Sequence, residues 1–510
     1  MSTFQGLELA KKALYAQQGA LYTTGHNIAN VNTTGYSRQR VNFETTSPFP
    51  MPSRVMPTIA GQIGTGVEIG TVERVRDQFL DKQFRAENSR ANYWSTKSEA
   101  LSRMEEVLNE PSEDGLSAQM DLLWQALQDL ADHPDNDGAR SVAAQRALAL
   151  TETFNHLSKS LQAIQGDLKE QIDVSTKNIN SLLSQINGLN EQIQKIEPHG
   201  MLANDLYDER DRLMDQLSNY MNIKVDYTKS SDSSLQIADG LASIQLIDRS
   251  GQSFDPPIYL IDARDRDNVI VNEFELAYND ADNAEKGLVS TITVDGVDVL
   301  QNILSSEGTL SGLLESYGVV GGGENNLYPN MLNELNKMAK QFAEAFNTQH
   351  QAGIDANGEP GKAFFVTKDG STDITAENIT VLGEIVKDPT LIAASAVNGG
   401  SRNGDNALDL AKVFDKDIEG LDDTSVRKYF IALIGDLGVK GQKANTMKNS
   451  TDILKSQIEN SRMSVTAVSL DEEISNLIKF QHAYNAAARS MTAIDELIDR
   501  VINQMGIVGR

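Results

Sequence analysis

Apolar residues recur at heptad spacing at both ends of the chain, and this feature constrains the fold more than any other. Near the start, the repeat is formed by Leu7, Leu14, Leu21 and Ile28, with Ala10, Gln17, Thr24 and Val31 three places after each. Near the end, apolar residues step by threes and fours through Leu470, Ile474, Leu477, Phe480, Tyr484, Ala487, Met491, Ile494, Ile498, Val501, Met505 and Val508. Such narrow stripes suit a partner helix better than a broad globular core. We therefore expect the two terminal helices to pair with each other and with copies of the chain.

The region between the two ends divides into helical and strand-like parts. An apolar repeat from Phe154 to Ile196 predicts a long helix that stops at Pro198 and Gly200. Shorter helical patterns cover residues 92–108, 116–131, 205–220 and 328–349, and alternating apolar and polar residues between 223 and 299 predict strands. No Gly or Pro occurs between Gln442 and Met505, so we expect one uninterrupted helix there.

A chain of 510 residues is too long for one compact core, and we divide it into three domains. Residues 1–35 with 470–510 form a terminal coiled-coil domain, residues 36–221 with 319–469 a helical core domain with some strands, and residues 222–318 an outer β-rich domain. The predicted fold class is multidomain and mainly α, with a β-rich insert. Because the first and last helices pair, we expect an elongated body in which residues deeper in the chain lie farther from that pair.

Composition and motifs exclude several classes of function. The net charge of -27 disfavours nucleic acid as a partner, and no apolar run is long enough to insert into a membrane. The start of the chain lacks the pattern of a secretory signal peptide. None of the common motifs for metalloproteases, phosphate-binding loops or serine hydrolases occurs, and Cys is absent. We expect no catalytic, cofactor-binding or metal-binding residues, a plain turn after Asp355, and carboxylates on a solvated surface.

The segment "NIANVNTTGYSRQRV", residues 27–41, follows the N-terminal heptads. Asn32, Thr33 and Thr34 compete with the helix by bonding to the backbone, and Gly35 permits a turn with positive φ. The large side chains that follow, Tyr36, Arg38 and Arg40, are spaced by two and would face one side of an extended segment. An ordinary helix end followed by a surface strand fits the same residues, so this pattern leaves both interpretations open.

The same residues carry a resemblance to a known family. The stretch "ANVNTTGYSRQ" resembles the Ala-Asn-x-x-Thr-x-Gly-Tyr signature of the bacterial flagellar axial proteins, which include rod, hook and hook-associated proteins. At the other end, Gln481, Ala483, Tyr484 and Ala486 fill the Gln-x-Ala-Tyr-x-Ala pattern of that family's last helix. The long central helices and "LNELNKMAKQFAEAFNTQHQAGIDANGEPG", residues 332–361, are most similar to hook-associated members.

The resemblance implies a structural subunit of the bacterial flagellum that forms the junction between hook and filament. It implies export through the flagellar type III apparatus without a cleaved signal, an extracellular location, and self-assembly through the terminal helices. The implied partners are copies of the chain in a ring, the hook protein, a second hook–filament junction protein and a cytoplasmic export chaperone. The alternatives are the hook protein itself, the other junction protein, or, from a different class, a secreted adhesin or enzyme.

The residues expected to act in assembly and export lie on the terminal helices and in the signature. The assembly interface is predicted to include Leu7, Leu14, Leu21, Ile28, Asn30, Thr33, Gly35, Tyr36, Arg38, Gln481, Tyr484, Met491, Ile494, Ile498 and Val501. The chaperone is predicted to bind the last helix through Ile494, Ile498, Val501 and Met505.

Overall fold

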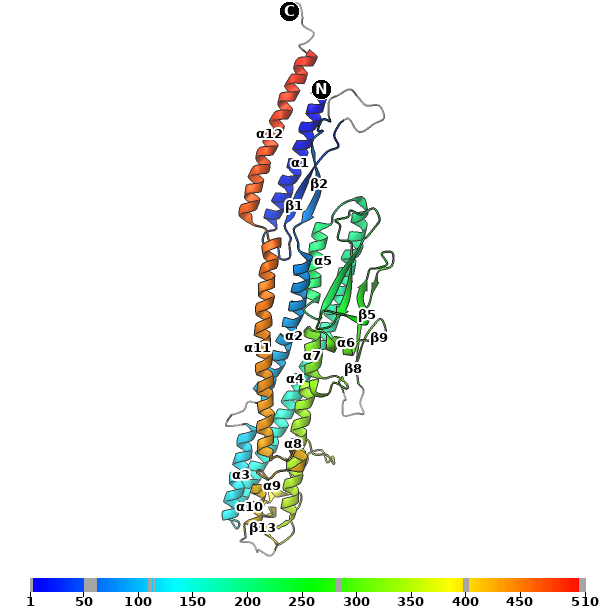
Figure 1. The fold of residues 1–510 in the computed structure, drawn as a ribbon. Helices are drawn as coiled ribbons and strands as arrows, with labels where there is room; N and C mark the ends of the chain where they lie inside the picture. The colour runs from blue at the N-terminus through cyan, green and yellow to red at the C-terminus, as the bar shows by residue number, and fades with distance from the viewer. Residues whose placement is uncertain are drawn as a thin grey trace, which may run out of the picture.

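The two terminal helices lie side by side at one end of an elongated molecule (Figure 1). The structure, a computed structural model, describes residues 3–49, 62–108, 112, 115–279, 287–397 and 403–503. The N-terminal helix α1 (Thr3–Ala29) packs against α12 (Leu470–Asn503) on one side and an antiparallel hairpin on the other. The hairpin consists of β1 (Gln39–Thr45) and β2 (Val67–Arg74).

Long helices form the body beneath this terminal pair. Helix α11 (Val426–Thr466) runs along α2 (Gln78–Leu108) and buries a residue every seven positions, namely Phe430, Leu437, Ala444 and Thr451. Helix α4 (Asp137–Ile196) has 60 residues, and at 1.5 Å per residue it is about 90 Å long. It passes into the short 3-10 helix η1 (Glu197–His199), where Pro198 lies and Gly200 adopts a φ of 73°. The predicted long helix and its end are confirmed.

Two small antiparallel sheets lie against the C-terminal half of α4 and α5 (Asn204–Leu217) (Figure 1). One sheet has the order β3 (Ile223–Thr228), β4 (Leu241–Ile247), β5 (Ser253–Asp262) and β6 (Ile270–Val271). The other has the order β7 (Phe274–Tyr278), β8 (Val289–Val294) and β9 (Val297–Asp298). Helices α6 (Leu300–Ser305) and α7 (Thr309–Tyr317) then return the chain to the helical body. The predicted fold class, mainly α with paired terminal helices and a β-rich insert, is confirmed, whereas the domain boundaries stay a prediction.

The end farthest from the terminal pair is formed by residues on both sides of the β-rich insert (Figure 1). It contains α3 (Leu116–Asp132), α8 (Leu327–Gln351), α9 (Gly383–Lys387) and α10 (Asp405–Lys412). Two short strand pairs, β10 (Gly353–Ile354) with β13 (Ser395–Ala396) and β11 (Phe365–Thr367) with β12 (Ile379–Val381), complete it with the 3-10 helices η3 (Pro389–Leu391) and η4 (Glu419–Leu421). The 3-10 helix η2 (Gly323–Asn325) precedes α8, and Val319 just before it forms a bridge with Val289 of β8.

The expectation that deeper residues lie farther from the terminal pair is wrong. Helix α4 starts at the far end and runs back toward the terminal pair, so the strands that follow it begin close to that pair (Figure 1). Helix α8 then carries the chain to the far end again, where Phe342, Phe346, Phe364, Phe365 and Phe414 form an aromatic core.

The single helix expected between Gln442 and Met505 is also interrupted. Helix α11 ends at Thr466, Ala467 is extended with φ -70° and ψ 149°, and α12 starts at Leu470. Ser469 precedes three acidic residues, Asp471, Glu472 and Glu473, in the first turn of α12. This is a helix-start pattern, because carboxylates stabilise the positive end of the helix dipole. No helix in the described residues is long and apolar enough to cross a membrane.

Candidate functional site

Helix α1 is held between α12 and the hairpin mainly by small residues. Ala10, Ala16 and Ala20 are buried, and a Cβ at Gly6 would lie 3.2 Å from Ile494 Cδ1, so the two helices approach closely there. The predicted heptad residues Leu7, Leu14, Leu21 and Ile28 are each half-buried rather than enclosed. The stripe therefore contributes to packing within one chain and still presents area to the outside.

The predicted residues of the last helix are divided between the inside and the outside of the pair. Ile498 is buried and Tyr484, Met491 and Ile494 are half-buried, while Gln481 and Val501 are exposed. Phe480, which precedes Gln481, packs edge-on against Phe43 of the hairpin with ring centroids 6.0 Å apart. Met505 lies outside the described residues.

Asn27 is the centre of a buried cluster that joins the signature to both terminal helices. Its side chain is 1% exposed and its Nδ2 donates to the Gln39 carbonyl at 2.8 Å and to Glu473 Oε2 at 3.1 Å. Its Oδ1 accepts from the Tyr36 hydroxyl at 2.7 Å and from Gln39 N–H at 3.0 Å. Burial raises the pKa of Tyr36 well above its ordinary value, so the hydroxyl stays protonated and remains a donor.

Arg38 completes this cluster from the opposite side. Its Nε donates to Glu473 Oε1 at 2.7 Å and its Nη1 to Glu472 Oε2 at 2.9 Å. Its backbone N–H donates to the carbonyl of Thr466 at 2.9 Å, at the point where α11 ends. At the break between α11 and α12, Arg38 therefore binds both the Thr466 carbonyl at the end of α11 and the carboxylates in the first turn of α12.

The remaining signature residues shape the turn. Gly35 has a φ of 84°, which confirms the predicted positive-φ turn. Asn30 Nδ2 donates to the His26 carbonyl at 3.1 Å, and the exposed Thr33 hydroxyl donates to Asn30 Oδ1 at 3.1 Å. Tyr36 binds α1 and Arg38 binds α12, so both side chains face the terminal pair, whereas Arg40 is exposed to solvent.

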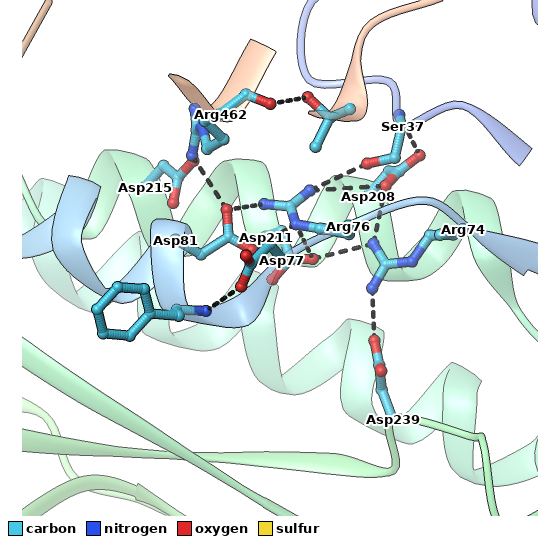
Figure 2. A network of polar contacts seen from close by, with 12 residues as sticks. Ser37, Arg74, Arg76, Asp77, Asp81, Asp208, Asp211, Asp215, Asp239 and Arg462 are labelled. Carbon is cyan, nitrogen blue, oxygen red and sulfur yellow. Dashed lines mark hydrogen bonds and ion pairs between the residues drawn. The ribbon is translucent and has the colours of Figure 1, made fainter. Parts of the chain in front are cut away.

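A buried network of arginines and aspartates lies beside Ser37, the residue between Tyr36 and Arg38 in the signature (Figure 2). Arg74 at the end of β2 binds Asp208 at 2.8 Å, Asp211 at 2.9 Å and Asp239 at 2.5 Å. Arg76 binds Asp81 at 2.6 Å and Ser37 Oγ at 3.2 Å. The network thus connects the hairpin to α2, to α5 and to the loop between β3 and β4.

Two further arginines extend the network into the helical body. Arg85 of α2 binds Asp211 at 3.1 Å and Asp215 at 2.8 Å, and Arg462 of α11 binds Asp215 at 2.5 Å. Burial opposes ionisation of Asp211, but the guanidinium groups of Arg76, Arg74 and Arg85 hold its pKa far below the ordinary range. The expectation that the carboxylates lie on a solvated surface is wrong here, because the three helices α2, α5 and α11 and the hairpin converge on them.

A cleft of about 650 Å³ separates the signature turn from the body. It is lined by residues 30–37, by α2 and α5, and by the last three turns of α11. In the ranges that the structure describes, no three His, Asp or Glu residues are grouped so that they could hold a metal ion. The signature segment and the arginine–aspartate network together connect the terminal pair to the body, and this connecting region is called the joint below.

Family models match this chain in three places. The model described as flagellar hook-associated protein FlgK helical domain matches residues 101–365. The model of the flagellar basal body rod FlgEFG protein C-terminal region matches residues 460–505, and that of the flagella basal body rod protein matches residues 7–36. The last two matches contain the residues of the Asn27 cluster that come from α1 and α12.

Whole-chain relatives agree with these matches. Flagellar hook-associated protein 1 of Bacillus subtilis (strain 168) is 44% identical over 515 residues, with 100% of both chains covered. Its namesake from Escherichia coli (strain K12) is 24% identical, with 97% of this chain and 98% of that protein covered. The structure of the flagellar hook junction protein FlgK from Burkholderia pseudomallei has a similar fold, with a TM-score of 0.58, 14% identity, and coverage of 76% of this chain and 100% of that chain. The resemblance to flagellar axial proteins is thereby confirmed, and the chain belongs to the flagellar hook-associated protein 1 (FlgK) family.

Proposed function

We propose that this chain is a structural subunit of the junction between flagellar hook and filament and that it assembles through α1 and α12. The observation that carries the proposal is the Asn27 cluster, in which the family signature locks the first and last helices together. A closed pair of this kind is a unit that can be repeated around an axis. Copies in a ring, the hook protein and a second junction protein are the partners, and the subunit is extracellular after export by the type III apparatus.

Exposed apolar side chains on the terminal pair support this role. Tyr22 is 78% exposed, and Phe4 and Tyr15 lie on the same outer side of α1. On α12, Ile474, Ile478, Leu497 and Ile502 are exposed as well. A concentration of large apolar side chains on an outer surface marks a site of association, because neighbouring copies remove that area from water. The predicted interface residues Leu7, Leu14, Leu21, Ile28 and Met491 supply the half-buried part of the same surface.

Helix α12 would bind the export chaperone before assembly. Ile494 and Ile498 face α1 in the closed pair, so a chaperone that covers them competes directly with α1. Val501 and Met505 extend that stripe. The chaperone therefore holds α12 apart from α1, and release of the chaperone permits the pair to close.

Membership of the family supports a structural rather than an enzymatic role, since the family is a structural flagellar one. The alternatives are the hook protein, the other junction protein, and a secreted adhesin or enzyme that uses the β-rich segment. Electron microscopy of isolated flagella with an epitope tag on this chain tests these alternatives, since label at the hook–filament boundary is expected. Label along the whole hook, or free protein only, would contradict the proposal.

A matched pair of variants tests the route of assembly. Leu14→Asp with Leu21→Asp should abolish incorporation and motility, because each carboxylate removed from water without a partner costs several kcal/mol. Val142→Asp with Val174→Asp makes the same chemical change at exposed positions of α4 and should leave motility intact. Normal motility of the first variant would refute assembly through α1.

A further inference from the structure

His26 lies beside the joint, where the end of α1 comes close to the start of α5. Its half-buried ring is 3.0 Å from the Tyr36 hydroxyl through Nδ1 and 3.9 Å from Asp205 Oδ2 through Nε2. All three side chains line a pocket of about 280 Å³ between the signature turn and α5. One imidazole ring is therefore placed between a helix of the terminal pair and a helix of the body.

The hydrogen bonds of Asn27 determine which atom donates in the contact between His26 and Tyr36. Asn27 Nδ2 lies beside two acceptors, the Gln39 carbonyl and Glu473 Oε2, and Asn27 Oδ1 lies 3.0 Å from the Gln39 backbone nitrogen. The amide cannot be turned over without the loss of these bonds, so Oδ1 is an acceptor. The Tyr36 hydroxyl has one proton and donates it to Asn27 Oδ1. The Tyr36 oxygen therefore accepts from His26, whose Nδ1 carries a proton.

A proton on Nδ1 leaves Nε2 as the nitrogen of His26 that titrates. In the neutral ring, the lone pair of Nε2 faces the Asp205 carboxylate, and two acceptors form no bond. A second proton turns the ring into an imidazolium, and Nε2–H and the carboxylate then attract each other as an ion pair. The contact between α1 and α5 at this point depends on that proton.

The surroundings of His26 favour a positive charge. His26 is in the last turn of α1, where the helix dipole is negative. The charged and titratable groups around it are Tyr22 of α1, Tyr36 of the signature, Asp205, Asp208, Glu209 and Arg212 of α5 and, beyond Asn27, Glu473 of α12. Carboxylates outnumber cations among these groups, so a charge on the ring meets attraction rather than repulsion.

Asp205 is the carboxylate that is available to a protonated His26. The other carboxylates around the ring are each bound by an arginine, in the pairs Asp208–Arg74, Glu209–Arg212 and Glu473–Arg38. Among the residues that the structure describes, Asp205 forms an ion pair with no Lys or Arg. Its Oδ1 accepts from Gln39 Nε2 at 3.0 Å, and this bond holds the carboxylate in place at the start of α5.

We propose that a second proton on His26 closes a link between α1 and α5, so that the joint is tighter in acidic than in neutral solution. The closed link binds one proton more than the open joint, so the free energy that holds the joint closed grows as the pH falls. The link is a property of the folded chain and does not rest on the proposed function. In a junction subunit it makes the connection between terminal pair and body respond to the pH of the medium.

Nitrogen NMR of the purified full-length chain, with its histidines labelled with ¹⁵N, tests the proton assignment. The variant His26→Gln identifies the His26 signals among those of the six histidines. In neutral solution we expect a proton on Nδ1 and none on Nε2. The opposite tautomer would overturn the inference, because the contact with Asp205 would then need no second proton.

A double-mutant cycle measures the link itself. The original chain, His26→Gln, Asp205→Asn and the double variant are compared by hydrogen exchange of the amides of residues 37–39, which are bonded to α5, to α11 and to Asn27. At a pH of about 5 we expect the pair to change the protection of these amides about two- to fivefold beyond the sum of the single variants, and at a pH of about 8 not at all.

The cycle separates His26 from other groups that titrate in acid. Asp208, whose pKa is raised by burial, and His350, whose pKa is lowered by burial, are present in all four chains, so their contributions cancel. His199→Gln is the control, since it removes an exposed histidine that precedes α5 and should leave the pH dependence of the joint unchanged. Coupling between His26 and Asp205 that does not grow as the pH falls would overturn the inference.

Discussion

Asp211→Asn should destabilise the protein by about 3 kcal/mol, because the substitution removes one carboxylate from among three buried guanidinium groups. Asp211 is 3% exposed, and its oxygens lie 2.9 Å from Arg74 Nη1, 3.1 Å from Arg85 Nη2 and 3.5 Å from Arg76 Nε. Loss of one partner from a buried ion pair costs roughly 3–5 kcal/mol. The lower end of that range applies here, since Asp208, Asp81 and Asp215 still compensate part of the positive charge (Figure 2).

Urea denaturation of the purified monomer measures this loss, with three variants compared. Asp211→Ala should cost somewhat more than Asp211→Asn, because both remove the charge and only the alanine variant also leaves a cavity. Glu209→Gln, two residues away, is the control. Glu209 is on the surface, where its ion pair with Arg212 contributes about 0–1 kcal/mol. A loss of stability below about 1 kcal/mol for Asp211→Asn would refute the reasoning that the buried guanidinium groups of Arg74, Arg76 and Arg85 depend on the Asp211 carboxylate.

The position of the network adds a second observable. Arg74 and Arg76 belong to the hairpin end and Arg462 to the end of α11, so the same variant should loosen the joint before the body unfolds. Hydrogen exchange should become faster in β1, β2 and the last turns of α11 while α4 keeps its protection. Uniform acceleration throughout the chain would mean that the network stabilises the fold globally and has no specific role at the joint.

Three further predictions concern single residues. Asn27→Ala should cost about 2–3 kcal/mol because Tyr36, Gln39 and Glu473 each lose a hydrogen bond, and it should make α12 sensitive to limited proteolysis, whereas Asn30→Ala, which removes a bond to the His26 carbonyl, should not. Burial lowers the pKa of His350 to about 4, so this histidine is neutral in the fold, and the free energy of unfolding should fall by roughly 3 kcal/mol as the pH drops from the ordinary histidine pKa of about 6.5 to 4. Urea midpoints between pH 7 and 4 measure that slope, and His350→Gln should flatten it. Gly308 has a φ of 144° and a Cβ there would overlap the Tyr220 carbonyl, so Gly308→Ala should lower the melting temperature by several degrees, equivalent to about 2 kcal/mol or more. Gly296→Ala, at a φ of 71° and in open space, should cost about half of that or less.

The sequence predicts the elements whose signal is local and repeated. The terminal pair, α4 and the strands after Ile223 all follow from apolar spacing, which needs no knowledge of distant residues. The break before Leu470 also had a local signal, Ser469 followed by three acidic residues, but the absence of Gly and Pro hid it. A helix can end without either residue where another segment binds its last carbonyl, as Arg38 does at Thr466.

The buried charges could not be predicted in the same way. Asp208, Asp211 and Asp215 lie three and four residues apart on α5, which alone is typical of a solvated helix face. Their partners, Arg74, Arg76 and Arg85, lie more than 120 residues earlier in the chain, so no local pattern links the two sets. Asn27 and Glu473 were missed for a related reason, since each looks like an ordinary polar residue of an amphipathic helix until the two ends of the chain meet.

Three consecutive residues of the signature explain why this segment is placed between the terminal pair and the body. Tyr36 and Arg38 point to the terminal pair, where they bind Asn27 and Glu473. Ser37 points the opposite way, and its backbone N–H donates to Asp208 Oδ2 at 2.9 Å while its hydroxyl accepts from Arg76. Alternate residues of an extended segment face opposite sides, so spacing by two is what allows one strand to bind two bodies at once. The signature therefore fixes the orientation of the terminal helices relative to the body, and a subunit that joins two different lattices depends on that orientation.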